Sequence, residues 1–264
     1  MSKLDADMIV GGRYLVTMDD IQPIIENGAV AIKNGQIIAV GTSENILLTY
    51  HADEILDGEN KVLRPGLVNA HTYAGMVLFR GMADDLPLMT WLQNYIFPME
   101  AKYVDEELIG AGTSLACYEM IQGGTTSFVD MYFYPDVIAE VVKTSGLRAT
   151  ISTPMIDFPS PGYEGWDDSF AGGVSFAKRW KGKHPRITPA LAPHAPYTVS
   201  KAHLQQAFSS ARDLDVPLSI HVAEEQTESK TIADQYGKST VHIVSNGGMT
   251  AHRTGQHHGV GPTE

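Results

Sequence analysis

Residues 125–158 read TTSFVDMYFYPDVIAEVVKTSGLRATISTPMIDF, and this pattern decides the fold class. The stretch begins with the strand-like run TTSFVDMY and continues with PDVIAEVVKTSG, which has the apolar spacing of a helix. It ends with a second strand-like run, RATISTPMIDF. A strand, a helix and a strand in this order predict a right-handed βαβ unit with parallel strands.

The same alternation extends in both directions along the chain. Helical patterns occur at DLPLMTWLQNYIFPMEAKYV, DEELIGAGTSLACYEMIQGG and KAHLQQAFSSARDLD, and strand-like runs at LVNAH, ITPALAPHA and PLSIHVAE. The chain has no glycine-rich dinucleotide or phosphate loop, and polar residues recur where strands end, as at the active face of a TIM barrel. We therefore expect an α/β fold in which residues 64–264 form an incomplete (β/α)8 TIM-type barrel of about five to six strands.

Residues 1–63 have a different pattern. Short strand-like runs are separated by the turn pairs Asn34–Gly35 and Asp57–Gly58, and the first pair lies between AVAIK and QIIAVG. We expect a small β-rich domain with an antiparallel sheet and a hairpin at Asn34–Gly35.

Composition narrows the class of protein. The chain has 264 residues, of which 43% are hydrophobic, so it can bury a core, and its net charge of −12 argues against binding to nucleic acid or anionic membranes. Its apolar runs are far shorter than the ~20 residues of a membrane span, and residues 1–10 lack the apolar core of a signal peptide. Cys117 is the single cysteine, which excludes a disulfide within the chain and predicts a cytoplasmic location.

Four polar residues stand at or just after predicted strand ends: His71, His194, His221 and Glu224. A single histidine at such a place is usually a hydrogen-bonded structural residue. Several on one rim of a barrel could instead hold Zn²⁺ with an open position for water, and the ion would lower the pKa of that water to about 7. Glu224 would then move the water proton, which predicts hydrolysis at an sp² carbon.

Three motifs resemble one family. Residues 65–100, PGLVNAHTYAGMVLFRGMADDLPLMTWLQNYIFPME, residues 192–200, APHAPYTVS, and residues 221–228, HVAEEQTE, are similar to signatures of the amidohydrolase superfamily. The nearest branch is that of the methylthioadenosine and S-adenosylhomocysteine deaminases and their chlorohydrolase relatives. The resemblance extends from about residue 8 to about residue 245 and implies a metal-dependent hydrolase.

The resemblance implies a role for particular residues. His71 and His221 would bind the metal, Glu224 would be the general acid/base, and His258 would be the histidine of the sixth strand that orients water and substrate. However, the tail RTGQHHGV is more polar than a buried parallel strand should be, so His258 stays an open assignment. Substrate contacts are implied for the following residues: Trp91 in the pocket wall, Glu100 at ribose hydroxyls, and His194.

Each of these substrate contacts has a plainer alternative. Glu100 could be a solvated helix residue, Trp91 an ordinary core residue, and His194 a capped strand end.

The sequence departs from the family at the metal site. Tyr73 stands where the family has the second histidine of a His-x-His pair, and a neutral phenol is a poor ligand for zinc. The family's last metal ligand, an aspartate after the eighth strand, has no counterpart before Glu264. We expect weakened binding of Zn²⁺, or of another divalent metal such as Fe, although Tyr73 could still ligate as a phenolate if the ion lowers its pKa. Because strands are missing from the barrel, we expect the chain alone to be poorly stable, to associate with itself or a partner, or to be a fragment of a longer gene.

Two functions remain open from the sequence. The first is a metal-dependent aminohydrolase of an adenosine-like nucleoside or related heterocycle. Methylthioadenosine is favoured because PMIDFPSPGYEG lacks the arginines of homocysteine-binding relatives. The second is a truncated, catalytically impaired remnant or a non-catalytic binding subunit. The sequence alone leaves the leaving group and the heterocycle unassigned.

Overall fold

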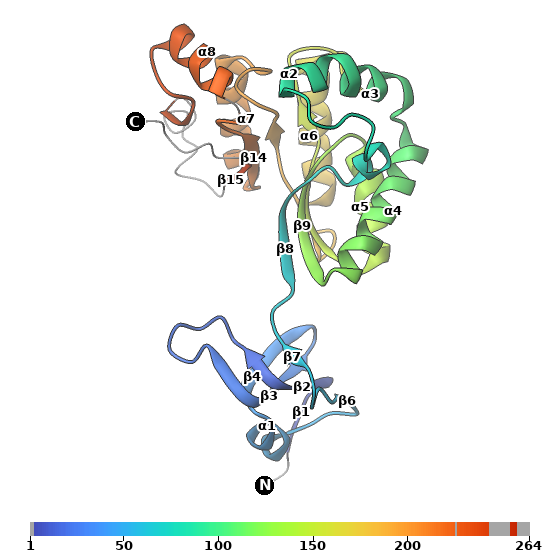
Figure 1. Cartoon of the computed structure of the whole chain (residues 1–264), viewed down its shortest axis with the longest axis vertical. Helices are drawn as coiled ribbons and strands as arrows, with labels where there is room; N and C mark the ends of the chain where they lie inside the picture. Colours follow the sequence, from blue (N-terminus) through green and yellow to red (C-terminus); the bar gives the residue numbers. More distant parts are fainter. Residues whose placement is uncertain (1–2, 225, 243–253, 258–264) are drawn as a thin grey trace. The chain divides into compact units, whose positions relative to one another are not determined.

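The computed structural model describes residues 3–224, 226–242 and 254–257 (Figure 1). The chain divides into two compact units, Met1–Gly66 and Leu67–Glu264, and each is described by itself. No helix in the described ranges has the length and apolar character needed to cross a membrane.

The first unit is built around a sheet with the strand order β4-β3-β2-β6, in which β7 also pairs with β2. The hairpin predicted at Asn34–Gly35 is confirmed, because Lys33 pairs with Gln36, and Asn34 and Gly35 have φ angles of 52° and 72°. Asn and Gly accept such angles readily, which is why this pair turns the chain. The elements are β1 (Leu4–Asp5), β2 (Met8–Val16), β3 (Ile24–Lys33), β4 (Gln36–Thr42), α1 (Ser43–Thr49), β5 (Tyr50–His51), β6 (Glu54–Leu56) and β7 (Val62–Leu63).

The antiparallel sheet predicted for residues 1–63 is confirmed only in part. β6 and β7 run parallel to β2, and only the β2-β3-β4 part is antiparallel. The chain passes through α1 after β4 and so enters the sheet again in the direction of β2, as a crossover connection allows. The helix α1 had not been predicted; Thr42 caps it by accepting a hydrogen bond from the Asn45 amide.

The second unit alternates strands and helices, and its strands pair in parallel. One sheet has the order β12-β10-β9-β8, β11 pairs with β13, and β14 pairs with β15. The α/β class and the parallel strand pairing predicted for this part are confirmed. The strands are β8 (Leu67–Thr72), β9 (Thr125–Met131), β10 (Arg148–Ser152), β11 (Pro154–Met155), β12 (Ile187–Pro189), β13 (Ala192–Pro193), β14 (Leu218–His221) and β15 (Thr254–His257).

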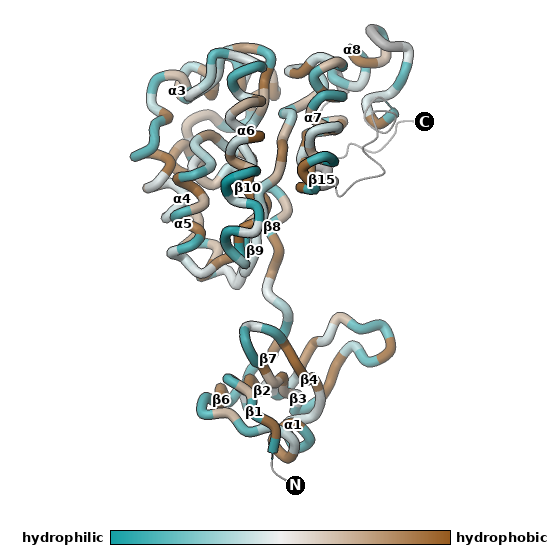
Figure 2. Tube along the Cα trace, turned by 180° about the vertical axis from the view of Figure 1, so that it is seen from behind, coloured by the Kyte–Doolittle hydropathy of each residue, from teal (hydrophilic) through white to brown (hydrophobic). Residues whose placement is uncertain are grey.

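Amphipathic helices cover these strands. α5 begins at Pro135 and is capped after Ser145 by Gly146, whose φ of 86° suits glycine. It buries Ile138 and Val142 completely. Brown and teal segments alternate along α5 and α6, as expected of helices that bury one face (Figure 2). The helices are η1 (Ala74–Phe79), α2 (Leu88–Trp91), η2 (Leu92–Ile96), α3 (Phe97–Tyr103), α4 (Glu106–Gln122), α5 (Pro135–Ser145), α6 (Trp166–Trp180), α7 (Lys201–Leu214) and α8 (Gln226–Tyr236).

The segment after β8 differs from its prediction. Residues 85–104 had been predicted as one helical stretch, but the structure has α2, a π-helical turn η2 and α3 in succession. Pro98 lies in the first turn of α3 and has no N–H to donate to the preceding turn, which accounts for a change of helical pitch just before it. This segment carries both Trp91 and Glu100.

The polar tail contains a strand. Thr254–His257 forms β15 and pairs with β14 in parallel register, His257 opposite His221. The position after β14 is where a sixth barrel strand is expected. His258 itself lies outside the described residues, so its assignment stays a prediction.

Candidate functional site

A cavity of about 540 Å³ lies in the second unit. Its wall includes Tyr73 after β8, Tyr132 after β9, His194 after β13 and Glu224 after β14, so it is formed where parallel strands end. The α2–α3 segment adds Trp91 and Glu100, among others. The structure therefore brings together in one cavity four of the residues singled out from sequence: Trp91, Glu100, His194 and Glu224.

Three rings meet beside this cavity. His71 and Tyr73 lie on the same side at the end of β8, with ring centroids 5.1 Å apart, as their spacing of two residues requires. The His221 ring, at the end of β14, lies 5.4 Å from the His71 centroid and 5.8 Å from that of Tyr73. The barrel thus brings together residues that are separated by about 150 positions in the sequence.

The hydrogen bonds of His221 define its tautomer. Its Nδ1 lies 2.9 Å from the backbone oxygen of His194, which can only accept, so Nδ1 carries the proton. In a neutral ring Nε2 is then an acceptor, and the Tyr73 hydroxyl donates to it. Burial, followed by the charge of Glu224, raises the pKa of Tyr73 well above its ordinary value, so the phenol keeps its proton.

His194 is a neutral, half-buried histidine. Burial lowers its pKa to about 4. The Thr198 hydroxyl donates to the Ala195 carbonyl, so its oxygen accepts a hydrogen bond of 2.9 Å from the His194 Nδ1. The His194 ring centroid lies 4.8 Å from that of His221. His194 is thus both a structural support of His221 and part of the cavity wall.

Glu224 is positioned by two residues that the sequence reasoning missed. The Tyr197 hydroxyl donates to its Oε2 over 2.9 Å. The Glu228 carboxylate accepts from the amides of Ala223 and Glu224 over 3.2 and 2.9 Å, and Ala223 has a φ of 54°. The spacing of the two acids in HVAEEQTE was the available signal, because a carboxylate in the first turn of α8 can bind the amides that precede the helix.

Asp130 was also missed. This fully buried residue of β9 accepts from the Thr72 hydroxyl over 2.7 Å and from the Ala74 amide over 2.6 Å, which holds the chain on both sides of Tyr73. Burial raises its pKa to about 6. A single acid inside the apolar strand TTSFVDMY was the sequence signal.

Glu100 is a buried carboxyl rather than a solvated helix residue. The residue is 7% exposed, and the Tyr132 hydroxyl donates to its Oε1 over 2.9 Å. Burial raises its pKa to about 7, although the Tyr132 hydrogen bond acts in the opposite direction.

Replacing Glu100 with glutamine is expected to stabilise the fold at alkaline pH. A pKa raised from 4.5 to about 7 means that the native state holds the proton longer than the unfolded state, so the stability of the wild type falls as pH rises through this window. The full difference is about 3 kcal/mol. Urea unfolding at pH 5 and pH 8 should show a smaller loss for Glu100→Gln than for the wild type. Exposed Glu107→Gln is the matched control, and equal losses for Glu100→Gln and the wild type would contradict the expectation.

The sequence matches the profile of the Amidohydrolase family over residues 62–263. The chain belongs to the amidohydrolase family. The resemblance drawn from residues 65–100, 192–200 and 221–228 is thereby confirmed.

Two curated relatives carry this comparison further. This amidohydrolase is 42% identical over 258 residues to the 5-methylthioadenosine/S-adenosylhomocysteine deaminase of Syntrophobacter fumaroxidans, a match that covers 97% of this chain and 58% of the relative. It is 40% identical to the 5'-deoxyadenosine deaminase of Methanococcoides burtonii over 90% of this chain and 54% of that protein. The chain therefore spans little more than half the length of the curated relatives it matches.

Two solved structures resemble this chain in fold. An adenosine deaminase from Xanthomonas campestris with bound zinc superposes with a TM-score of 0.90 at 36% identity, covering 96% of this amidohydrolase and 57% of that chain. Atrazine chlorohydrolase from Arthrobacter aurescens complexed with zinc has a TM-score of 0.84 at 18% identity, covering 97% and 61%. The second likeness concerns the fold alone.

Both of these solved structures contain zinc, but the described residues of this amidohydrolase do not form a site for it. Within residues 3–224, 226–242 and 254–257, no three His, Cys, Asp or Glu side chains are arranged to hold a metal ion. His71 and His221 lie close together, yet the His221 Nε2 is engaged by the hydroxyl of Tyr73, a phenol that keeps its proton. The donor set is therefore two imidazoles and a neutral phenol, which does not fit Zn²⁺.

Proposed function

We propose that the chain is the substrate-binding part of an aminohydrolase of adenosine-like nucleosides. The observation that carries the proposal is the cavity, whose lining includes Glu100, His194, Glu224 and the aromatic Trp91. A concave, largely apolar space with a few converging polar groups is what a nucleoside needs. The activities named for the relatives support the same substrate class.

In the proposed reaction, water adds to the amino-bearing carbon of the heterocycle and ammonia leaves. Glu224 would take a proton from the water and return it to the departing amine. The Tyr197 hydrogen bond to Oε2 would hold the carboxyl group in one orientation. His194, being neutral, would offer its imidazole to the heterocycle as a hydrogen-bonding group.

The ribose would be recognised by Glu100. A buried carboxyl accepts two hydroxyl hydrogen bonds well, and the Tyr132 hydroxyl holds its Oε1. Burial disfavours the anionic form of Glu100 because it removes water from the carboxylate. Hydrogen bonds from the ribose hydroxyls would take the place of that water.

The substrate should be uncharged at its 5' end. The described residues that line the cavity include the carboxyl groups Glu100 and Glu224 but neither Lys nor Arg, while Ile156, Phe158 and Pro159 form an apolar wall. A carboxylate in this space would lose hydration without gaining a cationic partner. Methylthioadenosine is therefore expected to bind at least about tenfold more tightly than S-adenosylhomocysteine, as measured by calorimetric titration. Equal affinities would contradict this assignment.

A second function is favoured by one contact. The Tyr73 hydroxyl occupies His221 Nε2, the nitrogen with which this ring would bind a metal ion. The chain could therefore bind nucleosides without turning them over. An ammonia-release assay on methylthioadenosine, adenosine and guanine, run with calorimetry on the same preparations, separates the two. Binding with ammonia release supports the hydrolase, binding without release supports the non-catalytic protein, and no binding would overturn both.

A further inference from the structure

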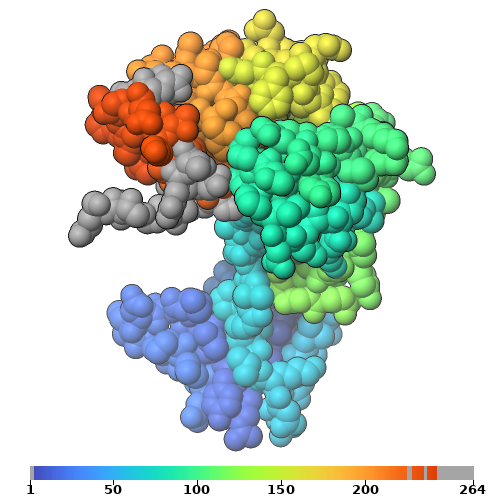
Figure 3. Space-filling view, turned by 45° about the horizontal axis from the view of Figure 1, so that its top comes forward, coloured from blue at the N-terminus to red at the C-terminus, as the bar shows by residue number. Residues whose placement is uncertain are grey.

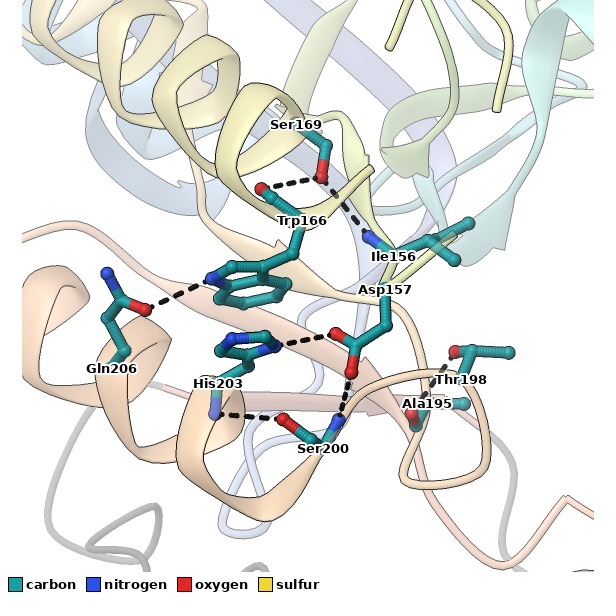
Figure 4. A network of polar contacts seen from close by, with 9 residues as sticks. All are labelled: Ile156, Asp157, Trp166, Ser169, Ala195, Thr198, Ser200, His203 and Gln206. Carbon is teal, nitrogen blue, oxygen red and sulfur yellow. Dashed lines mark hydrogen bonds and ion pairs between the residues drawn. The ribbon is translucent and has the colours of Figure 1, made fainter. Parts of the chain in front are cut away.

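A polar network outside the cavity connects the loop of residues 156–165 to the start of α7 (Figure 4). The first part of this loop lines the cavity on both sides of Asp157, but Asp157 itself is not among the lining residues. Figure 4 shows its carboxylate directed toward His203 and Ser200. The cavity-lining members of the loop are Ile156, Phe158, Pro159, Ser160, Pro161 and Gly162.

Asp157 makes three hydrogen bonds to the first turn of α7 and the residues just before it. Its Oδ1 accepts from the His203 Nδ1 over 2.8 Å, its Oδ2 accepts from the Ser200 amide over 2.9 Å, and its own amide donates to the Thr198 carbonyl over 3.1 Å. Ser200 is the N-cap of α7, so the carboxylate lies at the positive end of that helix. The contacts are therefore charge-assisted as well as numerous.

His203 connects this contact to α6. Its ring stacks on Trp166 with centroids 4.4 Å apart and planes 3° from parallel, and the Trp166 Nε1 donates to Gln206 of α7 over 3.0 Å. The Ser169 hydroxyl accepts from the Ile156 amide over 3.3 Å, which ties the beginning of the loop to α6. In Figure 3 the yellow residues of the loop and α6 adjoin the orange residues of α7.

The segment that Asp157 binds also contributes to the cavity wall. His194 and Tyr197 line the cavity a few residues before Ser200. The network thus joins two walls of one cavity through residues, Asp157 and His203, that are not among its lining.

We propose that Asp157 and His203 form a clamp that holds the 156–162 loop against the 194–200 segment and thereby sets the affinity of the cavity. The clamp is a positioning device, and its effect on nucleoside affinity rests on the function proposed above. If the loop closes the cavity only part of the time, the observed Kd equals the Kd of the closed form divided by the fraction of time that the loop is closed. A clamp that keeps the loop closed nearly always, and a variant closed about one tenth of the time, would differ about tenfold in Kd.

The test compares Asp157→Ala, Asp157→Asn and His203→Ala with the wild-type chain. Asp213→Asn, an exposed substitution on the same helix α7, is the control. Hydrogen exchange of the Ser200 and Asp157 amides, measured without nucleoside, reports the clamp directly. Calorimetric titration with methylthioadenosine reports its consequence, and urea unfolding reports global stability.

Asp157→Ala is expected to speed hydrogen exchange of the Ser200 amide and to raise the Kd for methylthioadenosine about tenfold. The urea midpoint should change little. Asp157→Asn keeps an oxygen for the Ser200 amide and should restore most of both properties, which a general loss of packing would not show. Unchanged exchange at Ser200 in Asp157→Ala would overturn the clamp. A wild-type chain that binds no nucleoside would overturn the proposed function, while the exchange measurement would still decide the clamp.

Discussion

Replacing Tyr73 with histidine is expected to raise the affinity of the chain for zinc by about three orders of magnitude. The variant would place a third imidazole beside His71 and His221, whose rings already lie 5.4 Å apart, and it would remove the hydroxyl that donates to the His221 Nε2. Three histidines suffice for a zinc site that keeps an open position. Zinc retained after dialysis should rise from a trace to about one ion per chain.

Two further measurements sharpen this prediction. Tyr73→Phe removes the hydroxyl without adding a nitrogen, so it should gain no metal; a gain would mean that the hydrogen bond, rather than the missing ligand, limits binding. Titration with Co²⁺ gives a visible absorption band that is independent of any activity. Stoichiometric zinc in the wild-type chain would contradict the donor set described above.

Replacing Glu224 with glutamine is expected to lower deamination of methylthioadenosine by about 10² to 10⁴-fold while leaving its binding within a few-fold of wild type. Glutamine keeps an oxygen that can accept from the Tyr197 hydroxyl, so the side chain stays in place, but it cannot take a proton from water. The measurements are the rate of ammonia release and the calorimetric Kd on the same preparation.

Two comparisons make the Glu224 result interpretable. Tyr197→Phe keeps the carboxylate and removes only its orienting hydrogen bond, so it should lose less activity than Glu224→Gln. If the wild-type chain releases no ammonia, the same pair is compared in the Tyr73→His background. A Glu224→Gln variant as active as its parent would remove this residue from the proposed chemistry.

Local patterns in the sequence were sufficient for most of the secondary structure. The Asn34–Gly35 turn and the N-cap of α4, Asp105, which accepts from the Leu108 amide, depend on residues close in sequence, so they could be predicted. The π-helical turn before Pro98 and the parallel pairing of β6 and β7 were missed. Both depend on how neighbouring segments return and pack, which apolar spacing does not record.

The candidate site was predicted unevenly for the same reason. Single residues with unusual chemistry at strand ends, such as His194 and Glu224, stand out in the sequence, and the cavity contains both. Their supports, Tyr197, Glu228 and Asp130, are common residue types whose partners become neighbours only after folding.

By itself the sequence determined that this chain is an α/β protein of the amidohydrolase family, because strand and helix periodicity and the three motifs are local properties. Only the tertiary structure decided that the Tyr73 hydroxyl meets the His221 Nε2, that Glu100 is buried beside Tyr132, and that Asp157 meets His203. These pairings join residues between 32 and 148 positions apart. Their geometry is set by strand register and helix packing, which act only once the chain has folded.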